Sequence, residues 1–505
     1  MNENPMRIRL RLLEEPKLLF GGNFTHFDPR TALTKAGPVD ARKGEIKRIP
    51  LGLVCPEAET ETVLRWFHTL DRPMIDSATN ALRFPDFPGA AKAFNCRFEL
   101  DAKHIRCLPE KEFQMARANT GTTQFENLLD VYTDVIIGLF GDAGPLAILV
   151  VFPEDIAELR VNNPRLSFAE QQSLKQRQEE NDNMQLDLFE SLNPKEKRAA
   201  AELFPQADEL LFRNFHRALK ARCMTIKNCV PLQIIRRHTY IPSEATQTDS
   251  TRAWHICTAL YYKSSNIPWQ PSDLAPGTCF VGISFHHLKR RGGDILYASL
   301  AQAFSTDTEP FALKGEMLPD RQVRDKQPYL LASQAEGIVK KVVAQFKART
   351  GTNPSRVVIH KSSTFQNEEV EGFLSGCGSS VPSCEMIWMR PSGFRLIRKG
   401  MNEVERGMLA NVEDEKTFLF TTGYVKWWKE YPGPHVPAPL EIGSGRDTDV
   451  IERAKEILAL TKMNWNSADG MGRHPITLSF ARQVGSIMTE VDENQEIQPL
   501  YRFYM

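Results

Sequence analysis

The sequence lacks several features that would assign it to a common class of protein. Its nine cysteines include no Cys-x-x-Cys pair and no Cys/His cluster, which argues against a structural zinc site and a disulfide framework. No apolar run approaches the span of a bilayer, and the N-terminal stretch has no apolar signal core. Neither a Gly-x-Gly-x-x-Gly loop nor a P-loop lysine motif is present. These absences predict a cytoplasmic protein with reduced thiols.

Net charge is also absent, because 63 basic residues balance 63 acidic residues among the 505. A nucleic-acid site, if there is one, must therefore be a local basic patch. Two sets of residues are candidates, although such clusters are commonly solvated faces: Lys289, Arg290 and Arg291, and Arg213, Arg217, Lys220 and Arg222. The length allows two to four domains with cores of their own.

Four polar residues between 216 and 263 are spaced as a pocket for a terminal phosphate requires. His216 and Lys220 are four residues apart and share one face if this segment is helical. Gln233 lies in the apolar run VPLQII, which is typical of a buried strand, and Lys263 ends a second helical segment before Ser-Ser-Asn-Ile-Pro. A basic pair, an amide and a second lysine can hold and orient a phosphate. Taken singly, Lys220 also fits a solvated helix face and Gln233 a polar strand end.

The order of these residues resembles the MID domain of Argonaute proteins, where such residues bind the 5′ phosphate of a guide strand. Further along, FVGISFHHL, ILYASLAQAF, RVVIHKSSTFQNEE and LTKMNWNSADGMGRHPITLSFARQVGSIM resemble successive landmarks of a PIWI domain. The resemblance covers roughly residues 130 to 505. It is strongest to the short prokaryotic Argonautes, because no PAZ-sized segment fits before the MID-like region.

The predicted fold class is α/β, with a Rossmann-like MID domain followed by an RNase H-like PIWI domain. The expected units are an α+β N-terminal lobe at 1–125, a MID-like domain at 126–270 and a PIWI-like domain at 271–505. Alternating strands and helices support the Rossmann-like unit. Its predicted elements are a strand at 146–152, a helix at 208–223, a strand at 229–235 and a helix at 252–263.

In the PIWI-like unit, CFVGISF is expected to pair antiparallel with ILYASLAQAF across the turn HHLKRRGGD. A helix at 332–350 and the strand RVVIH should follow. Residues 154–208 are charged and Gln-rich, which favours a solvated helical hairpin inserted in the MID-like domain. Alternatively they form an interaction arm, with an apolar stripe made by Met184, Leu186, Leu188 and Phe189.

The positions that resemble the PIWI catalytic site carry hydroxyl side chains. RNase H-like nucleases hold two metal ions with carboxylates. The resemblance places the first aspartate at Ser284, after Gly282-Ile283, and the second at Ser362, after His360-Lys361. Hydroxyl groups do not compensate the charge of two dications, so the PIWI-like unit is expected to bind without cutting, and no catalytic residue is assigned.

Two other functions remain open at this point. One is a metal-dependent nuclease of the PIWI type with an altered ligand set that uses Asp294 or Glu316. The other is a Rossmann-type protein whose phosphate pocket holds a nucleotide, although the usual glycine-rich loops are missing.

The resemblance also implies nucleic-acid and metal contacts near the C-terminus. Lys462, Asn464 and Arg482 lie in segments that resemble guide-backbone contacts, but they also fit surface charge and a capping asparagine. Met505 ends the aromatic tail YRFYM, and its carboxylate would bind a Mg²⁺ ion shared with the guide phosphate. A merely packed C-terminus is the alternative.

The function that the resemblance implies is guide-RNA-directed recognition of complementary single-stranded DNA in prokaryotic immunity. Base pairing would carry the specificity while the protein reads backbone and shape. The expected partner is a separate effector protein that carries an APAZ region fused to a TIR or Sir2 NAD-consuming domain or to a nuclease. A heterodimer with this effector, and a higher oligomer on activation, are expected. No membrane partner is expected.

Overall fold

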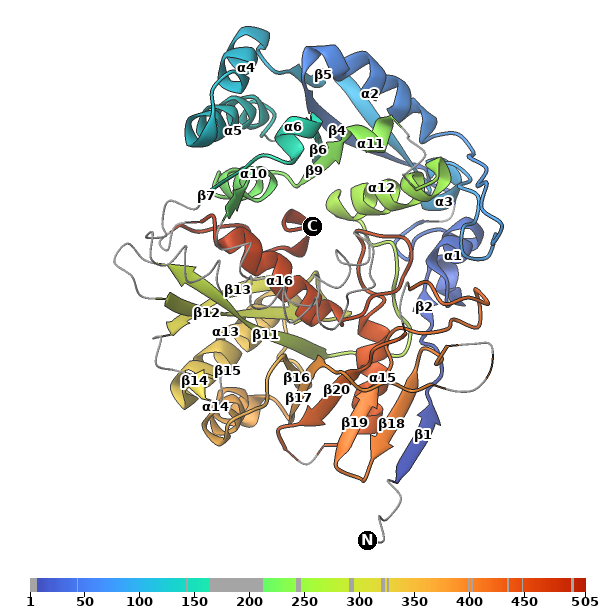
Figure 1. The fold of residues 1–505 in the computed structure, drawn as a ribbon, viewed down its shortest axis with the longest axis vertical. Coiled ribbons are helices and arrows are strands. Elements are labelled where there is room, and N and C mark those ends of the chain that lie inside the picture. Colours follow the sequence, from blue (N-terminus) through green and yellow to red (C-terminus); the bar gives the residue numbers. More distant parts are fainter. Residues whose placement is uncertain are drawn as a thin grey trace.

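The computed structural model describes residues 7–505 except 43, 142–143, 163–211, 242–246, 290–294, 319–322, 325–326, 398–399, 401–402, 434–435, 447 and 492–494. The chain forms two sheet-centred units, with the smaller sheet above the larger in Figure 1. Helix α16 (Ile476–Met488) and the C-terminal residues lie between them. In this part of the chain no helix is both long and apolar enough to cross a membrane.

The larger sheet has nine strands and includes the predicted PIWI-like unit. In spatial order they are β1 (Ile8–Leu12), β18 (Met408–Val412), β19 (Lys416–Leu419), β20 (Leu440–Ser444), β17 (Ser383–Pro391), β16 (Arg356–Lys361), β11 (Thr278–Lys289), β12 (Ile295–Phe304) and β13 (Phe311–Leu318). Strands β11, β16 and β17 are parallel, and the other neighbours are antiparallel. This mixed sheet is consistent with the predicted RNase H-like fold class.

The predicted hairpin, helix and strand are all present in this unit. Strand β11 pairs antiparallel with β12, with Ser284 opposite Leu300. Helix α13 (Ala332–Thr350) covers the predicted range, and β16 follows it. Parallel pairing of β16 with β11 places Lys361 opposite Ile283.

Alternation along β11 explains how helices cover both faces of this sheet. Cys279, Val281 and Ile283 pack in one core with α13 and α14 (Asn367–Cys377). Phe280, between them in sequence, packs in a second core with residues of α16. A Cβ atom added at Gly282 would lie 2.2 Å from the main-chain oxygen of Thr477. Glycine is therefore required here, because α16 approaches the strand backbone closely.

The smaller sheet is parallel and has the order β5 (Cys96–Cys107), β4 (Lys47–Cys55), β6 (Ala147–Phe152) and β9 (Leu232–Arg236). Side chains of α5 (Gly121–Ile137) and α10 (Phe215–Met224) pack on one face. Side chains of α2 (Glu57–Thr69) and α12 (Asp249–Lys263) pack on the other. Every residue of β6 is buried, as its continuous apolar sequence predicts. The Rossmann-like prediction is confirmed.

The predicted division at residue 125 is wrong. Residue 125 lies inside α5, and β4 and β5, which were assigned to a separate lobe, pair in the same sheet as β6. Strand β1 joins the other sheet by pairing with β18. The first 125 residues therefore complete both units and do not form a lobe of their own, because their strands obtain hydrogen-bond partners only from the later chain.

The predicted helical insertion lies mostly outside the described residues, including Met184, Leu186, Leu188 and Phe189. At its start the structure has α6 (Glu154–Ala157) and β7 (Arg160–Asn162). Strand β7 pairs with β8 (Phe212–Asn214), so the two ends of the segment meet.

The remaining elements are short. They are β2 (Leu18–Leu19), β3 (Thr25–His26) and β10 (Gln270–Pro271) in one small sheet, β14 (Val323–Arg324) with β15 (Gln327–Pro328), and the helices α1 (Pro29–Ala36), α3 (Ala90–Phe94), α4 (Glu110–Arg117), α11 (Arg237–Tyr240) and α15 (Val450–Leu460). All nine cysteines are free thiols, as predicted.

Candidate functional site

Helix α10 carries two of the four predicted pocket residues. The side chain of Asn214 caps its start by accepting a 3.4 Å hydrogen bond from the main-chain N–H of Arg217. His216 lies in the first turn and is half-buried, and Lys220, one turn later, is only 3% exposed. The N-terminus of the helix adds partial positive charge on the side of His216.

The other two residues meet at the edge of the smaller sheet. Lys263, the last residue of α12, is 1% exposed, and its ammonium group donates to Gln233 Oε1 at 2.7 Å and to the main-chain oxygen of Leu232 at 2.9 Å. Gln233 also donates through Nε2 to the main-chain oxygen of Ile234 at 3.0 Å. The structure thus places the end of α12 against β9, as the spacing predicts.

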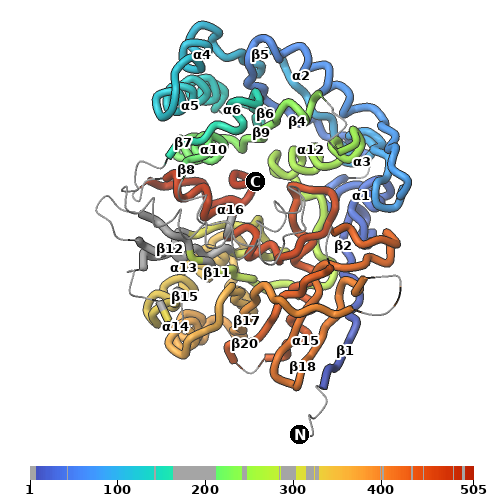
Figure 2. The backbone as a smooth tube through the Cα atoms, in the orientation of Figure 1, coloured from blue at the N-terminus to red at the C-terminus, as the bar shows by residue number. Residues whose placement is uncertain are grey.

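The C-terminal residue reaches the same place. Lys220 Nζ donates a hydrogen bond to the main-chain oxygen of Met505. Tyr501, Tyr504 and Met505 are buried, so the tail is packed and also contacts a predicted pocket residue. Figure 2 places the C-terminus beside α10 and α12, between the two sheets. We name the group His216, Lys220, Gln233 and Lys263 the lysine pocket.

The ionisable groups of the lysine pocket are strongly perturbed. Burial lowers the pKa of Lys220 to about 7. Burial, and then the charge of Lys220, lower the pKa of Lys263 well below its usual range. The pKa of His216 is well below its usual value because the ring is buried and because Lys220 and Lys263 are close. These shifts have a common cause, which is positive charge held away from water.

No carboxylate side chain among the described residues forms an ion pair with Lys220 or Lys263. His216 Nε2 is buried and has no hydrogen-bond partner within the same part of the chain. Buried charges without counter-charges are unfavourable, and proteins normally pair them. The lysine pocket is therefore built to receive an anion with several acceptor oxygens, which is the chemistry of a phosphate.

Two arginines near the pocket were not predicted to belong to it, although Arg217 was predicted as part of a basic patch. Arg236 and Arg217 both contribute to the lowered pKa of His216, after burial and the two lysines. Arg236 ends β9 and pairs with Glu158 at 2.7 Å. The sequence could have indicated Arg236, which begins a double arginine three residues after Gln233. Polar residues at the C-terminal end of a buried parallel strand lie at the edge of the sheet where ligands bind.

The lysine pocket alone does not fit a magnesium ion. Its oxygen atoms are the side-chain oxygen of Gln233, the main-chain oxygen of Leu232 and an oxygen of the terminal residue Met505, and each accepts a hydrogen bond from an ammonium group. Mg²⁺ prefers anionic oxygen ligands in octahedral geometry. A phosphate would have to supply such oxygens before the ion could bind near Met505.

Two arginines of the predicted basic patch, which spans β8 and α10, are neutralised by carboxylates. Arg213 pairs with Glu490 at 2.8 Å and with Glu126, and Arg222 pairs with Asp130. Lys220 is the member of this set that points to the pocket. Arg290 and Arg291 lie outside the described residues.

The backbone contact predicted for Lys462 is wrong. Its side chain is 0% exposed, and Nζ binds Glu15 at 2.7 Å and the main-chain oxygen of Pro16 at 3.0 Å. It holds the N-terminal segment to the larger unit and has no surface for a phosphate. Asn464 is half-buried, and its side-chain oxygen accepts a 3.1 Å hydrogen bond from the N–H of Asn466. Arg482 lies on α16, and its contact stays a prediction.

The two degenerate catalytic positions are adjacent in the larger sheet. Ser284 follows Ile283, Ser362 follows Lys361, and Ile283 and Lys361 are paired. Ser362 is exposed at the end of β16. Of the alternative ligands, Asp294 falls outside the described residues, and Glu316 lies in β13, which β12 separates from β11.

The residue before Ser362 belongs to a buried ion pair. Lys361 and Glu369 are both 0% exposed, and Lys361 Nζ lies 2.6 Å from Glu369 Oε2. Glu369 also accepts hydrogen bonds from the main-chain N–H groups of Leu330 and Gln366. Within the described ranges there is no group of three or more His, Cys, Asp or Glu side chains that could hold a metal ion.

Comparison with solved structures identifies the fold. Drosophila Piwi matches with a TM-score of 0.60 at 12% identity, covering 98% of this chain and 56% of that chain. Clostridium butyricum Argonaute, solved with a guide DNA and a 19-mer target DNA, matches at 0.58 and 15% identity, covering 96% and 54%. A. aeolicus Argonaute matches at 0.53 and 13% identity, covering 97% and 54%.

The chain spans about half the length of these proteins. Its sequence matches no protein-family model and no curated protein. At these low identities the similarity concerns the fold, and that fold is the MID–PIWI arrangement of Argonaute proteins.

Proposed function

We propose that this chain is a guide-directed recognition subunit. It binds the 5′ phosphate of a guide RNA in the lysine pocket and presents the guide to a complementary single-stranded DNA, which it does not cut. The fold is consistent with this proposal, since an Argonaute of the same fold has been solved with a guide and a target.

The observation that carries the proposal is the pair of buried lysines that have no Asp or Glu partner among the described residues, with Lys220 held only by the terminal residue Met505. In the free protein they repel each other and are poorly hydrated, as the lowered pKa values of both groups indicate. A terminal phosphate would supply the missing negative charge and accept several charge-assisted hydrogen bonds at once. An internal phosphodiester carries less charge, so the pocket favours a strand end.

The absence of cutting is proposed from Ser284 and Ser362. Two-metal cleavage needs anionic ligands at both positions, whereas a channel for a guide–target duplex needs donors to phosphates. Recognition can therefore persist where hydrolysis does not.

A recognition subunit without cutting activity needs a second protein to produce an output. We include in the proposal an APAZ-containing effector with an NAD-consuming TIR or Sir2 domain, or a nuclease domain. Target pairing activates such a partner only through differential binding to its active state, and a nearly complete switch requires about 5.5 kcal/mol.

Mg²⁺ enters the proposal only together with the guide phosphate. Met505 and the guide phosphate would supply oxygen ligands to the ion, and Lys220, which now donates to Met505, would donate to the phosphate instead. When bound, Mg²⁺ would neutralise charge and fix the orientation of the guide end. Its contribution can be measured as the Mg²⁺ dependence of binding of a 5′-phosphorylated guide.

The test compares 5′-phosphorylated and 5′-hydroxyl guides of one sequence on the purified chain and on Lys263→Met. A hydrogen bond to a charged group contributes about 1.5–3 kcal/mol, so the variant should lose roughly tenfold or more in affinity for the phosphorylated guide. Binding of the hydroxyl guide should change little. Lys227→Met, at an exposed lysine, is the matched control. Equal losses for both guides would overturn the proposal.

A further inference from the structure

Strand β1 is an exposed edge of the nine-stranded sheet. All five of its residues are exposed, and within the described chain it pairs only with β18. Its place at the margin of the larger unit is visible in Figure 1. Charged side chains on an edge strand, here Arg9 and Arg11, discourage pairing with strands that do not match them.

The hydrogen-bonding groups on the free edge can be assigned from the register. The N–H of Leu13 donates to Gly407 at 2.9 Å, and the oxygen of Arg7 accepts from Glu413 at 2.8 Å. Odd-numbered residues thus direct their main-chain groups to β18. The N–H and C=O groups of Ile8, Leu10 and Leu12 therefore face outward and can pair with another strand.

The two faces of β1 differ in chemistry. Ile8, Leu10 and Leu12 are 39%, 56% and 40% exposed and alternate with arginines. The arginine face has Arg7, Arg9 and Arg11. Asp414 is the carboxylate beside it, at 3.8 Å from Arg7 and 2.5 Å from Arg9. One carboxylate against three guanidinium groups leaves a net positive face that favours acidic residues on a neighbouring strand.

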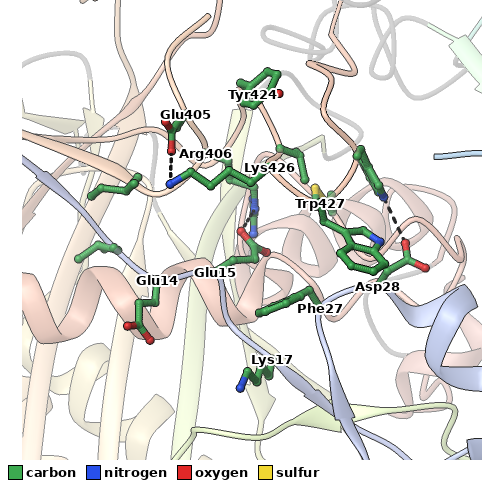
Figure 3. Close-up of a pocket in the computed structure, with 15 residues that line it drawn as sticks. Glu14, Glu15, Lys17, Phe27, Asp28, Glu405, Arg406, Tyr424, Lys426 and Trp427 are labelled. Atoms are coloured by element: carbon green, nitrogen blue, oxygen red, sulfur yellow. Dashed lines mark hydrogen bonds and ion pairs between the residues drawn. The ribbon is translucent and has the colours of Figure 1, made fainter. Parts of the chain in front are cut away.

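A cavity of about 600 Å³ adjoins the end of β1. Leu12 and Leu13 line it, together with the aromatic residues Phe27, Tyr424, Trp427 and Trp428. In Figure 3 side chains from the segment after β1 face those from the 405–428 segment across this space.

The charged groups that line this cavity largely satisfy one another. Lys426 binds Glu405 at 2.9 Å, and Arg406 binds Glu15 at 2.9 Å. The indole N–H of Trp427 is buried and has no acceptor among the described residues. Glu14 and Lys17 are exposed and also line the cavity. Its buried part is aromatic and has the free donor of Trp427, which suits a large apolar or aromatic side chain.

We propose that β1 and the adjoining aromatic cavity form a docking site for an extended segment of another protein. The segment adds a strand to β1, carries acidic residues beside the arginine face, and inserts one aromatic side chain into the cavity. Such strand addition takes affinity from main-chain hydrogen bonds and specificity from side-chain pockets. This inference deepens the proposed function, because it rests on a partner protein that receives the signal.

The chemistry of β1 argues against two other partners, a second copy of this chain and a nucleic acid. A second copy of β1 would bring arginine faces together across the new pair, and like charges on neighbouring strands are destabilising. A nucleic acid would satisfy the arginines but would leave the apolar face and the outward main-chain groups without partners. An acidic and apolar polypeptide satisfies all three features.

The probe is a labelled peptide of alternating Glu and Val that ends in Trp, titrated against the full guide-loaded chain. A peptide with Lys in place of Glu, and one with Ala in place of Trp, test the charge and the anchor. The acidic Trp peptide should bind at least tenfold more tightly than the Lys peptide, and Trp427→Ala should abolish the preference for Trp over Ala. No binding of the acidic peptide, or equal binding of the Lys peptide, would overturn the proposal.

Leu10→Pro tests strand addition directly. It removes an N–H that faces the free edge and leaves the ladder to β18 intact, which proline tolerates on an edge. Leu10→Ala keeps the N–H and is the matched control. Peptide binding should fall at least tenfold more for Leu10→Pro than for Leu10→Ala, and equal effects would contradict strand addition.

Guide binding measured on the same samples separates this inference from the proposed function. If Leu10→Pro also loses guide binding, the fold is disturbed and Arg11→Glu is tested instead. Arg11→Glu should weaken binding of the acidic peptide and strengthen binding of the Lys peptide. An unchanged preference between the two peptides would overturn the docking site. Equal binding of phosphorylated and hydroxyl guides by the parent protein would remove the proposed function and leave the peptide result standing.

Discussion

The ammonium group of Lys263 lies 2.7 Å from the side-chain oxygen of Gln233, and both of these residues are part of the lysine pocket. The contact joins the last residue of α12 to β9. Gln233 is a neutral partner, so it fixes the position of Lys263 without cancelling its charge. A carboxylate at the same place would also hold the lysine, but it would cancel the positive charge that a phosphate needs.

Gln233→Glu should therefore reduce guide binding through charge with almost no change in shape. The new carboxylate would pair with Lys263 and repel a guide phosphate, so affinity for a 5′-phosphorylated guide should fall roughly tenfold or more. Gln233→Ala, which loses a hydrogen bond but adds no charge, should cost less. Binding titrations with phosphorylated and hydroxyl guides measure both, and a larger loss for Ala than for Glu would contradict this role of charge.

Lys220→Met should stabilise the free protein while it weakens guide binding. Burial lowers the pKa of Lys220 to about 7 in the folded chain, below its unfolded value. The unfolded state therefore binds more protons above that pH, so wild-type stability rises with pH as the buried charge is lost. The gain from methionine should be about 0.5–2 kcal/mol, largest near neutral or lower pH and smaller in alkaline buffer. Thermal unfolding across pH tests this, and Lys227→Met should show neither effect.

Binding of a phosphorylated guide should weaken as pH rises above about 7. In the free protein Lys220 loses its proton there, whereas a bound phosphate raises the pKa of the lysine again. Binding then requires proton uptake, and affinity should fall by up to about tenfold for each unit of pH. A hydroxyl guide and the Lys220→Met variant should show a flatter profile. Affinity that increases with pH would contradict the assignment of Lys220 as a phosphate contact.

The guide-loaded chain should leave a complementary single-stranded DNA intact in Mg²⁺ or Mn²⁺. The expectation follows from Ser284 and Ser362, because neither hydroxyl supplies the negative charge of a metal ligand. A target labelled at both ends, analysed by gel, is the measurement. Cleavage that survives repurification and is lost in Asp294→Ala or Glu316→Ala would show that other carboxylates hold the metal ions.

A complex of this chain with a co-encoded APAZ effector should remain silent with guide alone and consume NAD when complementary single-stranded DNA is added. Pairing along the guide is the step that can supply the roughly 5.5 kcal/mol needed for a nearly complete switch. NAD concentration followed over time, with a non-complementary DNA as control, provides the test. If both NAD and nucleic acids stay unchanged in the fully loaded complex, a passive binding role is the better account.

Local patterns in the sequence predicted the elements that carry the lysine pocket. The spacing of His216 and Lys220, the apolar run around Gln233 and the helical segment that ends at Lys263 were sufficient, because helix and strand periodicity are short-range properties. The hairpin of β11 and β12 and the limits of α13 were predictable for the same reason.

Long-range pairing was not predictable in the same way. Strand β4 pairs with β6 although the four helices α2 to α5 and strand β5 intervene, and β1 pairs with the distant strand β18. The residues of these strands do not indicate which strand each one pairs with, because main-chain hydrogen bonds are alike for every sequence. The predicted N-terminal lobe failed on this point.

The sequence by itself determined which residue types stand where: the pocket lysines, the serines at the degenerate positions and the alternating apolar and arginine residues of β1. Only the tertiary structure decided which of these charges are free. It paired Lys462 with Glu15 and Lys361 with Glu369, and it left Lys220 and Lys263 buried without an Asp or Glu partner among the described residues. The physical reason is that the state of a charge depends on burial and on neighbours within a few ångströms, and those neighbours come from distant parts of the chain.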